Sequence, residues 1–572
     1  MPAIKITAHA NIDGVVIAWS ISHAIPGCLG FALERKLNDG TITELETEMP
    51  FEGQPKPAKG HREPSSVWPI QRFIWTDHSA PLESDLRYRV RPVKGSADAP
   101  ELAAESEASD WTPAVRCATG STEGFELYPN LGVAAAPWVE RRIEAARNSS
   151  PTPKPSVSSV LKTSIETTGN ELRNALAGPL LKALRREFDR ASEAGEEIFA
   201  ALYELRDHEL RELLIAAGDR VHVILANGAF NAEDPDPNSE AADQLAGEGI
   251  DVKRRMVGSG HFAHNKFLVF TKDGVPQRVW TGSTNWTPSG LCTQSNHGVL
   301  IEANPVAVGF MEYWKRLQAA GDGYPPALAE GNANPVVHKV GTKLKLRAWC
   351  TPVKNHVDLD DARAMIDGAQ DGAVFLMFKP GSKDTLVDNL RALHDRNLFI
   401  RGIVNAGFAI DASRDTIQFF NKSAKSVHGK PELLLPDHLR KAFGNLGPET
   451  AGGAVLIHSK TIVVDPFGKH PIVMTGSHNL GPKASKSNDD NLVIIENAGG
   501  LAAEFAVYIM NVYDHYRWRY EKGLREEAAK AAAAASAPPS GNVWKGLKPN
   551  ASWQNASYLA SAQTEMAFWS HS

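Results

Sequence analysis

Short runs in which apolar and polar residues alternate dominate residues 1–120. Turn-forming residues such as Asn38-Asp39-Gly40 separate these runs. Alternation with a period of two is typical of strands that bury one face, and several such runs at short spacing favour an antiparallel sandwich. We therefore expect an all-β sandwich over residues 1–120, with strands at Ile4–Ala8, Val15–Ser20, Gly30–Leu37, Ile70–Thr76, Leu86–Pro92 and Thr112–Cys117.

Beyond a Pro/Ser-rich stretch at 144–160, apolar residues recur at helical spacing, beginning with Glu171–Ala194. The pattern that follows predicts helices alternating with strands, which is typical of an α/β lobe with parallel strands. The same order returns in residues 362–405. The expected strands are Ile198–Leu202 and Val221–Ala226 in the first lobe, and Val374–Phe378 and Phe399–Asn405 in the second.

The C-terminal part of the chain is predicted to contain one long helix, a linker and a tail. Leu501–Tyr520 predicts a helix with an aromatic, core-facing stripe, and an Ala/Pro-rich linker follows it. The tail holds Trp544, Trp553 and Trp569, with little periodicity. The predicted organisation is a sandwich at 1–120, a first lobe at 121–340, a second lobe at 341–528, and a linker with a tryptophan-containing tail at 529–572.

One stretch occurs twice. Residues 458–479 read HSKTIVVDPFGKHPIVMTGSHN, and residues 264–285 read HNKFLVFTKDGVPQRVWTGSTN. Both begin with H-x-K and end with G-S-x-N, and in both the serine follows the histidine by 19 positions. Equal spacing in two blocks 194 residues apart indicates an internal duplication. Each block predicts a strand, a turn and a second strand, which would bring its histidine, lysine, serine and asparagine to one pocket.

These residue types suit the cleavage of a phosphodiester. Two histidines can supply a nucleophile and a proton donor, because imidazole titrates near neutral pH. Two lysines can neutralise the non-bridging oxygens, and the Asn and Ser side chains can donate hydrogen bonds to them. The histidines do not fall at zinc-like spacing with cysteines or carboxylates, so we expect no metal or other cofactor.

Composition and charge restrict the expected location of the protein and its expected partners. The formal net charge of −6 provides no general attraction to nucleic acid or anionic lipid. The N-terminus has no evident secretory signal, and there is no uninterrupted apolar stretch of about 18 residues, so we expect a cytoplasmic protein without a membrane span. The four cysteines have no C-x2-C spacing and are expected to be free thiols, with a Cys28–Cys117 disulfide as the alternative.

The two blocks resemble the paired HKD motifs of the phospholipase D superfamily, over about residues 125–525. The resemblance implies a bilobal α/β body of two duplicated mixed-sheet lobes, in which the two motifs form one active site. The first 120 residues resemble a fibronectin type III domain. The first motif departs from the family pattern, because Thr271 stands where an Asp is expected and Asp273 follows two positions late.

By this resemblance the reaction proceeds through a phosphohistidine intermediate, followed by transfer to water or an alcohol. The catalytic candidates are His264, Lys266, His458, Lys460 and Asp465; the substrate-binding candidates are Ser283, Asn285, Ser477 and Asn479; the supporting candidates are Asp490, Glu302, Glu496 and Asp273. The carboxylates Asp490, Glu302 and Glu496 are expected to fix a histidine tautomer.

We assign His264 as the nucleophile and His458 as the general acid, although symmetry leaves the reverse open. Asp490 and Asn296 occupy equivalent places, 32 positions after their motif histidines. A carboxylate stabilises imidazolium, so Asp490 is expected to give His458 the more anionic setting and to keep it protonated.

The first hypothesis is a phospholipase D-type phosphodiesterase that acts on phospholipid. A metal-independent nuclease with the same histidines is the first alternative, which the acidic charge and the lack of basic runs disfavour. The second is a catalytically decayed binding protein, with the sandwich or the tail recruiting a protein partner.

Overall fold

The structure is a computed structural model that describes residues 4–55, 57–58, 60–118, 124–132, 137–150, 154–341, 343–381, 383–405, 417–420, 427–429, 457–535 and 546–570. The chain divides into two compact units. The first comprises Met1–Thr119, Ala503–Asp514 and Glu521–Ser572, and the second comprises Gly120–Ala502 and His515–Tyr520. The long helix α14 (Gly499–Ala535) contributes to both units.

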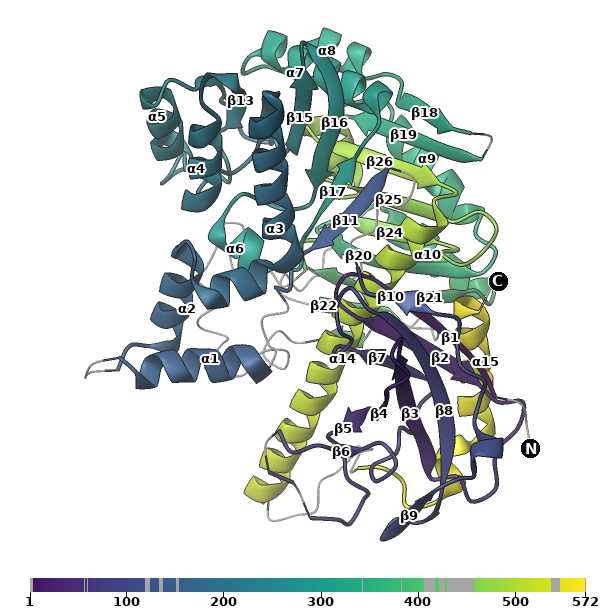
Figure 1. The fold of residues 1–572 in the computed structure, drawn as a ribbon. Coiled ribbons are helices and arrows are strands. Elements are labelled where there is room, and N and C mark those ends of the chain that lie inside the picture. Colours follow the sequence, from purple (N-terminus) through teal and green to yellow (C-terminus); the bar gives the residue numbers. More distant parts are fainter. Residues whose placement is uncertain are drawn as a thin grey trace. The chain divides into compact units, whose positions relative to one another are not determined.

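The first unit contains two antiparallel sheets. One has the order β1-β2-β7, and the other has the order β10-β8-β3-β4 with β9 paired to β8 (Figure 1). The strands are β1 (Lys5–Ala10), β2 (Val15–Ser20), β3 (Gly30–Leu37), β4 (Ile42–Glu44), β7 (Ile74–Asp77), β8 (Asp85–Ser96), β9 (Ala99–Leu102) and β10 (Val115–Arg116), with a short pair β5 (Glu46–Thr47) and β6 (Glu63–Pro64). Alternate residues of both sheets share one hydrophobic core, in which Trp19 and Tyr88 are fully buried. The all-β character expected from the alternation is confirmed, and the finer likeness to fibronectin type III remains a prediction.

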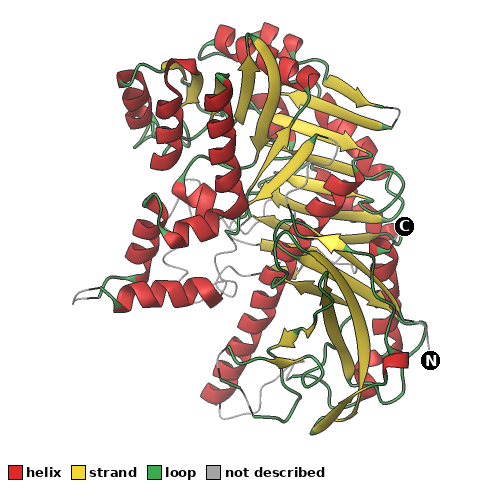
Figure 2. Ribbon diagram, in the orientation of Figure 1, coloured by secondary structure: helices red, strands yellow, loops and turns green. Residues whose placement is uncertain are grey.

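The C-terminal tail completes this core. It forms η5 (Ala551–Gln554) and α15 (Ala556–Trp569), shown in Figure 2 as helices beside the yellow strands. Trp553 packs against the rings of Phe31 and Phe73, and its indole N–H donates to the Cys28 carbonyl over 2.9 Å. The tail is therefore built into the sandwich core; Trp544 lies outside the described residues.

The second unit contains two mixed sheets with matching strand orders. The first has the order β11-β17-β16-β15-β12-β13-β14, and the second has the order β18-β19-β26-β25-β24-β20-β21-β22-β23. The strands of the first are β11 (Phe125–Pro129), β12 (Glu197–Leu202), β13 (Val221–Ala226), β14 (Asp251–Arg255), β15 (Lys266–Lys272), β16 (Val275–Gly282) and β17 (His297–Ile301). The strands of the second are β18 (Val336–Val340), β19 (Leu344–Cys350), β20 (Gly372–Phe378), β21 (Phe399–Asn405), β22 (Ile417–Phe420), β23 (Val427–Gly429), β24 (Thr461–Val464), β25 (Ile472–Gly476) and β26 (Asn491–Glu496).

Helices cover these sheets. The first lobe has α1 (Pro137–Asn148), α2 (Val157–Glu166), α3 (Glu171–Ala194), α4 (His208–Ala217), α5 (Ser239–Gly247), α6 (Pro288–Cys292), α7 (Asn304–Ala320) and α8 (Pro326–Gly331). The second has α9 (Val357–Asp367), α10 (Leu386–Asp395) and α13 (Pro482–Ser487). In both lobes a parallel β-α-β unit adjoins the antiparallel motif strands, so the predicted duplicated α/β fold is confirmed. No helix in the described residues is long and apolar enough to cross a bilayer.

The duplication is exact enough to define equivalent positions. Motif residues of the two lobes are equivalent at a separation of 194, as His264 and His458 are. On the neighbouring strand, Ile198 pairs with Phe270, and Ala373 pairs with Val464. Because Phe270 and Val464 are themselves 194 apart, residues of β12 and β20 are equivalent at a separation of 175.

Candidate active site

The two motif segments pair with each other's lobes. The backbone N–H of His264 donates to the carbonyl of Asp489 over 2.9 Å, and that of His458 donates to the carbonyl of Ser295 over 3.0 Å. Asp489 and Ser295 are equivalent positions, so this is the reciprocal contact pattern of a two-fold interface, formed within one chain. It carries the two motif histidines to the boundary between the lobes, as the resemblance implies.

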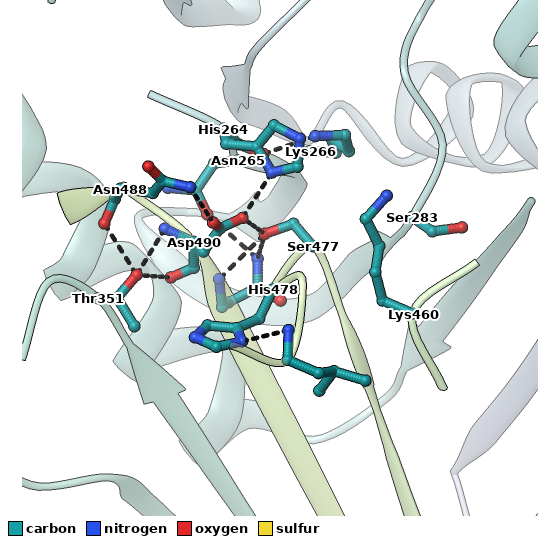
Figure 3. Close-up of polar contacts among 12 residues, drawn as sticks. His264, Asn265, Lys266, Ser283, Thr351, Lys460, Ser477, His478, Asn488 and Asp490 are labelled. Carbon is teal, nitrogen blue, oxygen red and sulfur yellow. Dashed lines mark hydrogen bonds and ion pairs between the residues drawn. The ribbon is translucent and has the colours of Figure 1, made fainter. Parts of the chain in front are cut away.

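The side-chain partners of the histidines also come from the opposite lobe. His264 Nδ1 lies 2.8 Å from Asp490 Oδ1, and Figure 3 shows Asp490 between His264 and Ser477. His458 Nδ1 lies 3.0 Å from Asn296 Oδ1 and 3.0 Å from the Ser283 carbonyl. The prediction that Asp490 gives His458 the more anionic setting was therefore wrong. Asp490 and His458 belong to the same lobe, but the two-fold apposition directs each partner across the boundary.

Burial and charge set the protonation of the His264 pair. Burial would raise the pKa of Asp490, but the adjacent His264, with smaller contributions from His478 and Lys266, holds that pKa below its usual value. Burial, followed by the charge of Lys266, lowers the pKa of His264, against a raising effect of Asp490. At neutral pH the ionised carboxylate therefore accepts from a neutral imidazole that carries its proton on Nδ1. Its Nε2 retains a lone pair.

The serines of the two G-S-x-N elements hold these partners. Ser477 Oγ donates to Asp490 Oδ1 over 2.7 Å, and Ser283 Oγ donates to Asn296 Oδ1 over 2.8 Å. Each hydroxyl also accepts a backbone N–H from the following strand. Ser283 and Ser477 were predicted to bind substrate; in the structure they orient the groups that orient the histidines.

The lysines and asparagines complete the cluster. Lys266 Nζ and Lys460 Nζ donate to the carbonyl of their own motif histidine over 2.7 Å. Asn285 donates to Glu204, whereas the Oδ1 atoms of Asn285 and Asn479 have no hydrogen-bond partner among the residues that the structure describes. His264, Lys266, His458 and Lys460 are each at most 3% exposed, so their charges act in a poorly solvated setting where electrostatic effects are strong.

Two aromatic residues that the sequence reasoning missed lie against the histidines. The Tyr203 ring centre is 4.7 Å from that of His264, and the Phe378 ring centre is 4.6 Å from that of His458. They are equivalent positions directly after β12 and at the end of β20. Lys266 Nζ is 4.9 Å from the Tyr203 ring centre and Lys460 Nζ is 4.8 Å from that of Phe378. The sequence signal that could have identified them is an aromatic residue at the end of the strand that neighbours each motif strand.

Asp465 is placed away from this cluster. It follows β24, whereas Lys460 precedes that strand. Its carboxylate accepts the backbone N–H groups of Gln370, Asp371 and Gly372 over 2.8–2.9 Å. Asp465 therefore supports the start of β20 and does not line the site, contrary to its expected catalytic place.

The departure in the first motif falls at the same structural position. Thr271 is equivalent to Asp465, and its hydroxyl lies 3.4 Å from the Glu197 carboxylate at the start of β12. Asp273 is exposed in the turn between β15 and β16. The substitution of Thr for Asp at position 271 thus affects a contact at one end of β15, and His264 precedes the other end of this strand.

Two supporting candidates are also corrected. Glu302 pairs with Arg190, and Glu496 pairs with Arg347 over 2.6 Å. Glu302 directly follows β17 and Glu496 is the last residue of β26, so both lie at the end of their strand away from Asn296 and Asp490, which precede those strands. Neither carboxylate therefore fixes a histidine tautomer.

Buried polar contacts brace the two lobes around the cluster. Arg255 of the first lobe forms a buried, two-pronged ion pair with Asp489 of the second. Thr281 donates to Asn491 over 2.7 Å, and at the equivalent place Thr475 lies 2.6 Å from His297 Nε2. Burial lowers the pKa of His297 to about 3, so His297 is neutral.

The described part of the chain has no group of three or more His, Cys, Asp or Glu side chains placed to hold a metal ion. All four cysteines are buried and free, as expected. The disulfide alternative for Cys28 and Cys117 is not realised in the structure.

Comparison with known protein families identifies a family that matches both lobes. Residues 186–318 and 362–513 match the family described as "Cardiolipin synthase, PLD-like domain". These segments span about half of the chain and include both motifs. No curated protein matches the chain.

Solved structures with similarity to this fold have low sequence identity. Phosphatidylserine synthase from Haemophilus influenzae is 12% identical, with 62% of this chain and 92% of that chain covered and a TM-score of 0.41. The phospholipase D family member Nuc from Salmonella typhimurium is 22% identical, with 25% and 90% covered and a TM-score of 0.21. Yeast tyrosyl-DNA phosphodiesterase is 11% identical, with 53% and 82% covered and a TM-score of 0.27. On the match of both lobes to the family and on the duplicated motif, this chain belongs to the phospholipase D superfamily.

Proposed function

We propose that the protein is a phospholipase D-type phosphodiesterase that cleaves a phospholipid through a phosphohistidine intermediate. The observation that supports the proposal most directly is the His264–Asp490 pair. A neutral imidazole with its Nδ1 proton held by a carboxylate presents a nucleophilic Nε2, and the carboxylate stabilises the positive charge that develops on attack.

In the first step, Nε2 of His264 attacks phosphorus as the bond to the leaving alcohol breaks. His458 gives a proton to the departing oxygen. In the second step, a water or an alcohol attacks the phosphorus of phosphohistidine, loses its proton to His458, and releases His264. Lys266 and Lys460 counter the charge on the non-bridging oxygens throughout.

The unequal partners of the two histidines support this division of roles. Asp490 favours a positive charge on His264 once its Nε2 is phosphorylated. The amide of Asn296, being neutral, stabilises imidazolium less than a carboxylate does, which favours proton release from His458. The roles assigned from the sequence are thus kept, on a different electrostatic argument.

The test uses a soluble chromogenic diester, bis(p-nitrophenyl) phosphate, and a short-chain phospholipid. His264→Ala and His458→Ala should each reduce turnover of both substrates at least a hundredfold, about the effect of losing one essential group. Rapid acid-free quenching followed by peptide mapping should find the phosphoryl group on His264. Turnover of the diester without any turnover of lipid would refute the lipid assignment, and label on His458 alone would reverse the roles.

A further inference from the structure

The side-chain amide of Asn285, in the first G-S-x-N element, is held in one orientation. Its Nδ2 donates to Glu204 Oε2 over 2.5 Å, and the other oxygen of that carboxylate is ion-paired with Arg206 over 2.6 Å. An ionised carboxylate has no proton to donate, so only the nitrogen end of the amide can face it. The Glu204 contact therefore fixes the Asn285 Oδ1 atom on the side away from the carboxylate.

This Oδ1 atom is a buried acceptor without a donor. Asn285 is 2% exposed, and its Oδ1 receives no hydrogen bond from any residue that the structure describes. A buried polar atom in this state costs free energy, and a bound molecule with an O–H or N–H group would remove that cost. The non-bridging oxygens of a phosphodiester are acceptors themselves, so they do not suit this position.

The amide lies on segments that contact both motif histidines. Two residues before Asn285, the Ser283 carbonyl is 3.0 Å from His458 Nδ1. The carboxylate that holds the amide belongs to the residue directly after Tyr203, whose ring centre is 4.7 Å from that of His264. Two residues of chain span at most about 7 Å, so the Asn285 Oδ1 atom can contact a molecule bound beside His458.

The second lobe has no counterpart of the Glu204 contact. At the separation of 175 that relates β12 to β20, Glu204 is equivalent to Lys379, whose side chain is a donor. A lysine cannot accept from the nitrogen end of an amide, so it does not fix Asn479, the equivalent of Asn285, in the same orientation. Only the first G-S-x-N element therefore has its amide oxygen directed by a carboxylate at this position.

We propose that Asn285 Oδ1 selects water over an alcohol as the attacking molecule in the second step. This inference rests on the proposed function, which allows both. Water attacks phosphorus, the bond from phosphorus to His264 Nε2 breaks with its electron pair returning to that nitrogen, and one water proton passes to His458. The second O–H bond of the water stays intact and donates to Asn285 Oδ1.

An alcohol lacks this second O–H. Its single proton passes to His458, and the buried Oδ1 atom of Asn285 is left without a donor while the alcohol attacks. Asn285 thus contacts the attacking molecule directly, whereas Glu204 is a positioning residue that acts through the amide. The expected result is a phosphodiesterase that hydrolyses its phosphoenzyme in preference to transferring the phosphoryl group to an alcohol.

The test measures how the phosphoenzyme partitions between water and methanol. Bis(p-nitrophenyl) phosphate is turned over at a fixed concentration of methanol, and the products p-nitrophenyl phosphate and methyl p-nitrophenyl phosphate are quantified. Asn285→Ala should raise the ratio of methyl product to hydrolysis product about 2- to 13-fold over wild type, the effect of one neutral hydrogen bond. The ratio is set after the phosphoenzyme has formed, so it does not depend on the amount of folded protein.

Two further variants separate orientation from the loss of a charge. In Glu204→Gln the new side chain can donate as well as accept, so it no longer fixes the amide, and the ratio should rise by less than in Asn285→Ala. Glu496→Gln is the matched control, because Glu496 is also paired with an arginine over 2.6 Å but lies at the far end of β26. Its ratio should equal that of the wild type.

A ratio in Asn285→Ala within twofold of wild type would overturn the inference, and so would an equal rise in the Glu496→Gln control. If Asn285→Ala released no product, the Glu204→Gln ratio would decide, and an unchanged value would again overturn it. If the wild-type protein turned over no diester, or formed no phosphoenzyme, the proposed function would fail instead, which distinguishes the two failures.

Discussion

Replacement of Asp490 by Asn isolates the charge on the nucleophile's partner. In the opposite half of the site, Asn296 already shows how an amide fits: its Oδ1 accepts from His458 Nδ1 and from Ser283 Oγ. An Asn at 490 can copy this arrangement. The neighbouring Asn488 now donates to Asp490 Oδ2 over 3.2 Å, and within the described part of the chain its own Oδ1 has no hydrogen-bond partner. This amide can therefore rotate to accept from the new one.

Geometry and tautomer should therefore survive in Asp490→Asn, and only the negative charge is lost. A hydrogen bond to a charged group contributes about 1.5–3 kcal/mol, so kcat/KM should fall by about 10- to 150-fold. This is less than the roughly 10⁴-fold loss expected when an Asp→Asn change leaves a catalytic histidine in the wrong tautomer.

The pH dependence gives a second, signed expectation. The nucleophile must be neutral, so activity rises with pH through the pKa of His264, which burial places below 6.5. Asp490 opposes that lowering, and its neutral replacement should lower the pKa of His264 further. The acid limb of kcat/KM for bis(p-nitrophenyl) phosphate should move to lower pH. An acid limb that moves to higher pH, or a rate loss under threefold in a variant of wild-type thermal stability, would refute the reasoning.

Three further predictions follow from other parts of the structure. Trp553→Ala should destabilise the sandwich unit by about 3–5 kcal/mol in denaturant unfolding, because a large core ring is lost; the control Trp518→Ala, at a residue 42% exposed, should cost much less, and equal effects would contradict a core role for the tail. Asp465→Asn should reduce stability by about 1–3 kcal/mol through a buried N–H left without an acceptor, yet keep kcat of the folded protein within about threefold; a hundredfold loss of kcat at unchanged stability would place Asp465 in catalysis. Hydrolysis should persist in EDTA, since Lys266 and Lys460 provide the positive charge, and activity that is lost in chelator and restored by a divalent ion would contradict this.

The sequence predicted the frame of the site well. Strand alternation, helical spacing and the 194-residue repeat predicted an all-β region followed by two α/β lobes, and the shared offsets identified both H-x-K elements. These features are local, since a strand or a motif is determined by residues within about twenty positions of one another. The prediction therefore succeeded for the strands, the helices and the two motifs.

It failed where contacts cross between segments. Asp490 was assigned to His458 because they are close in sequence, whereas the two-fold apposition pairs it with His264. The little periodicity of the tail left open whether it docks on the body or binds a partner, and the structure places the Trp553 ring in the sandwich core. Asp465 was taken as catalytic from its motif, and only its three backbone N–H partners reveal a supporting role. A single sequence does not contain the relative placement of two lobes, on which the first of these contacts depends.

The reciprocal pairing of the lobes restricts how the enzyme can move during turnover. A hinge motion that separated them would break His264 from Asp490, His458 from Asn296 and the buried Arg255 from Asp489 in a single step. The last of these is a buried, two-pronged ion pair, and two-pronged charge-assisted hydrogen bonds are among the stronger polar contacts. The candidate catalytic groups are thus held together in the absence of substrate, and separating the two lobes would dismantle the site.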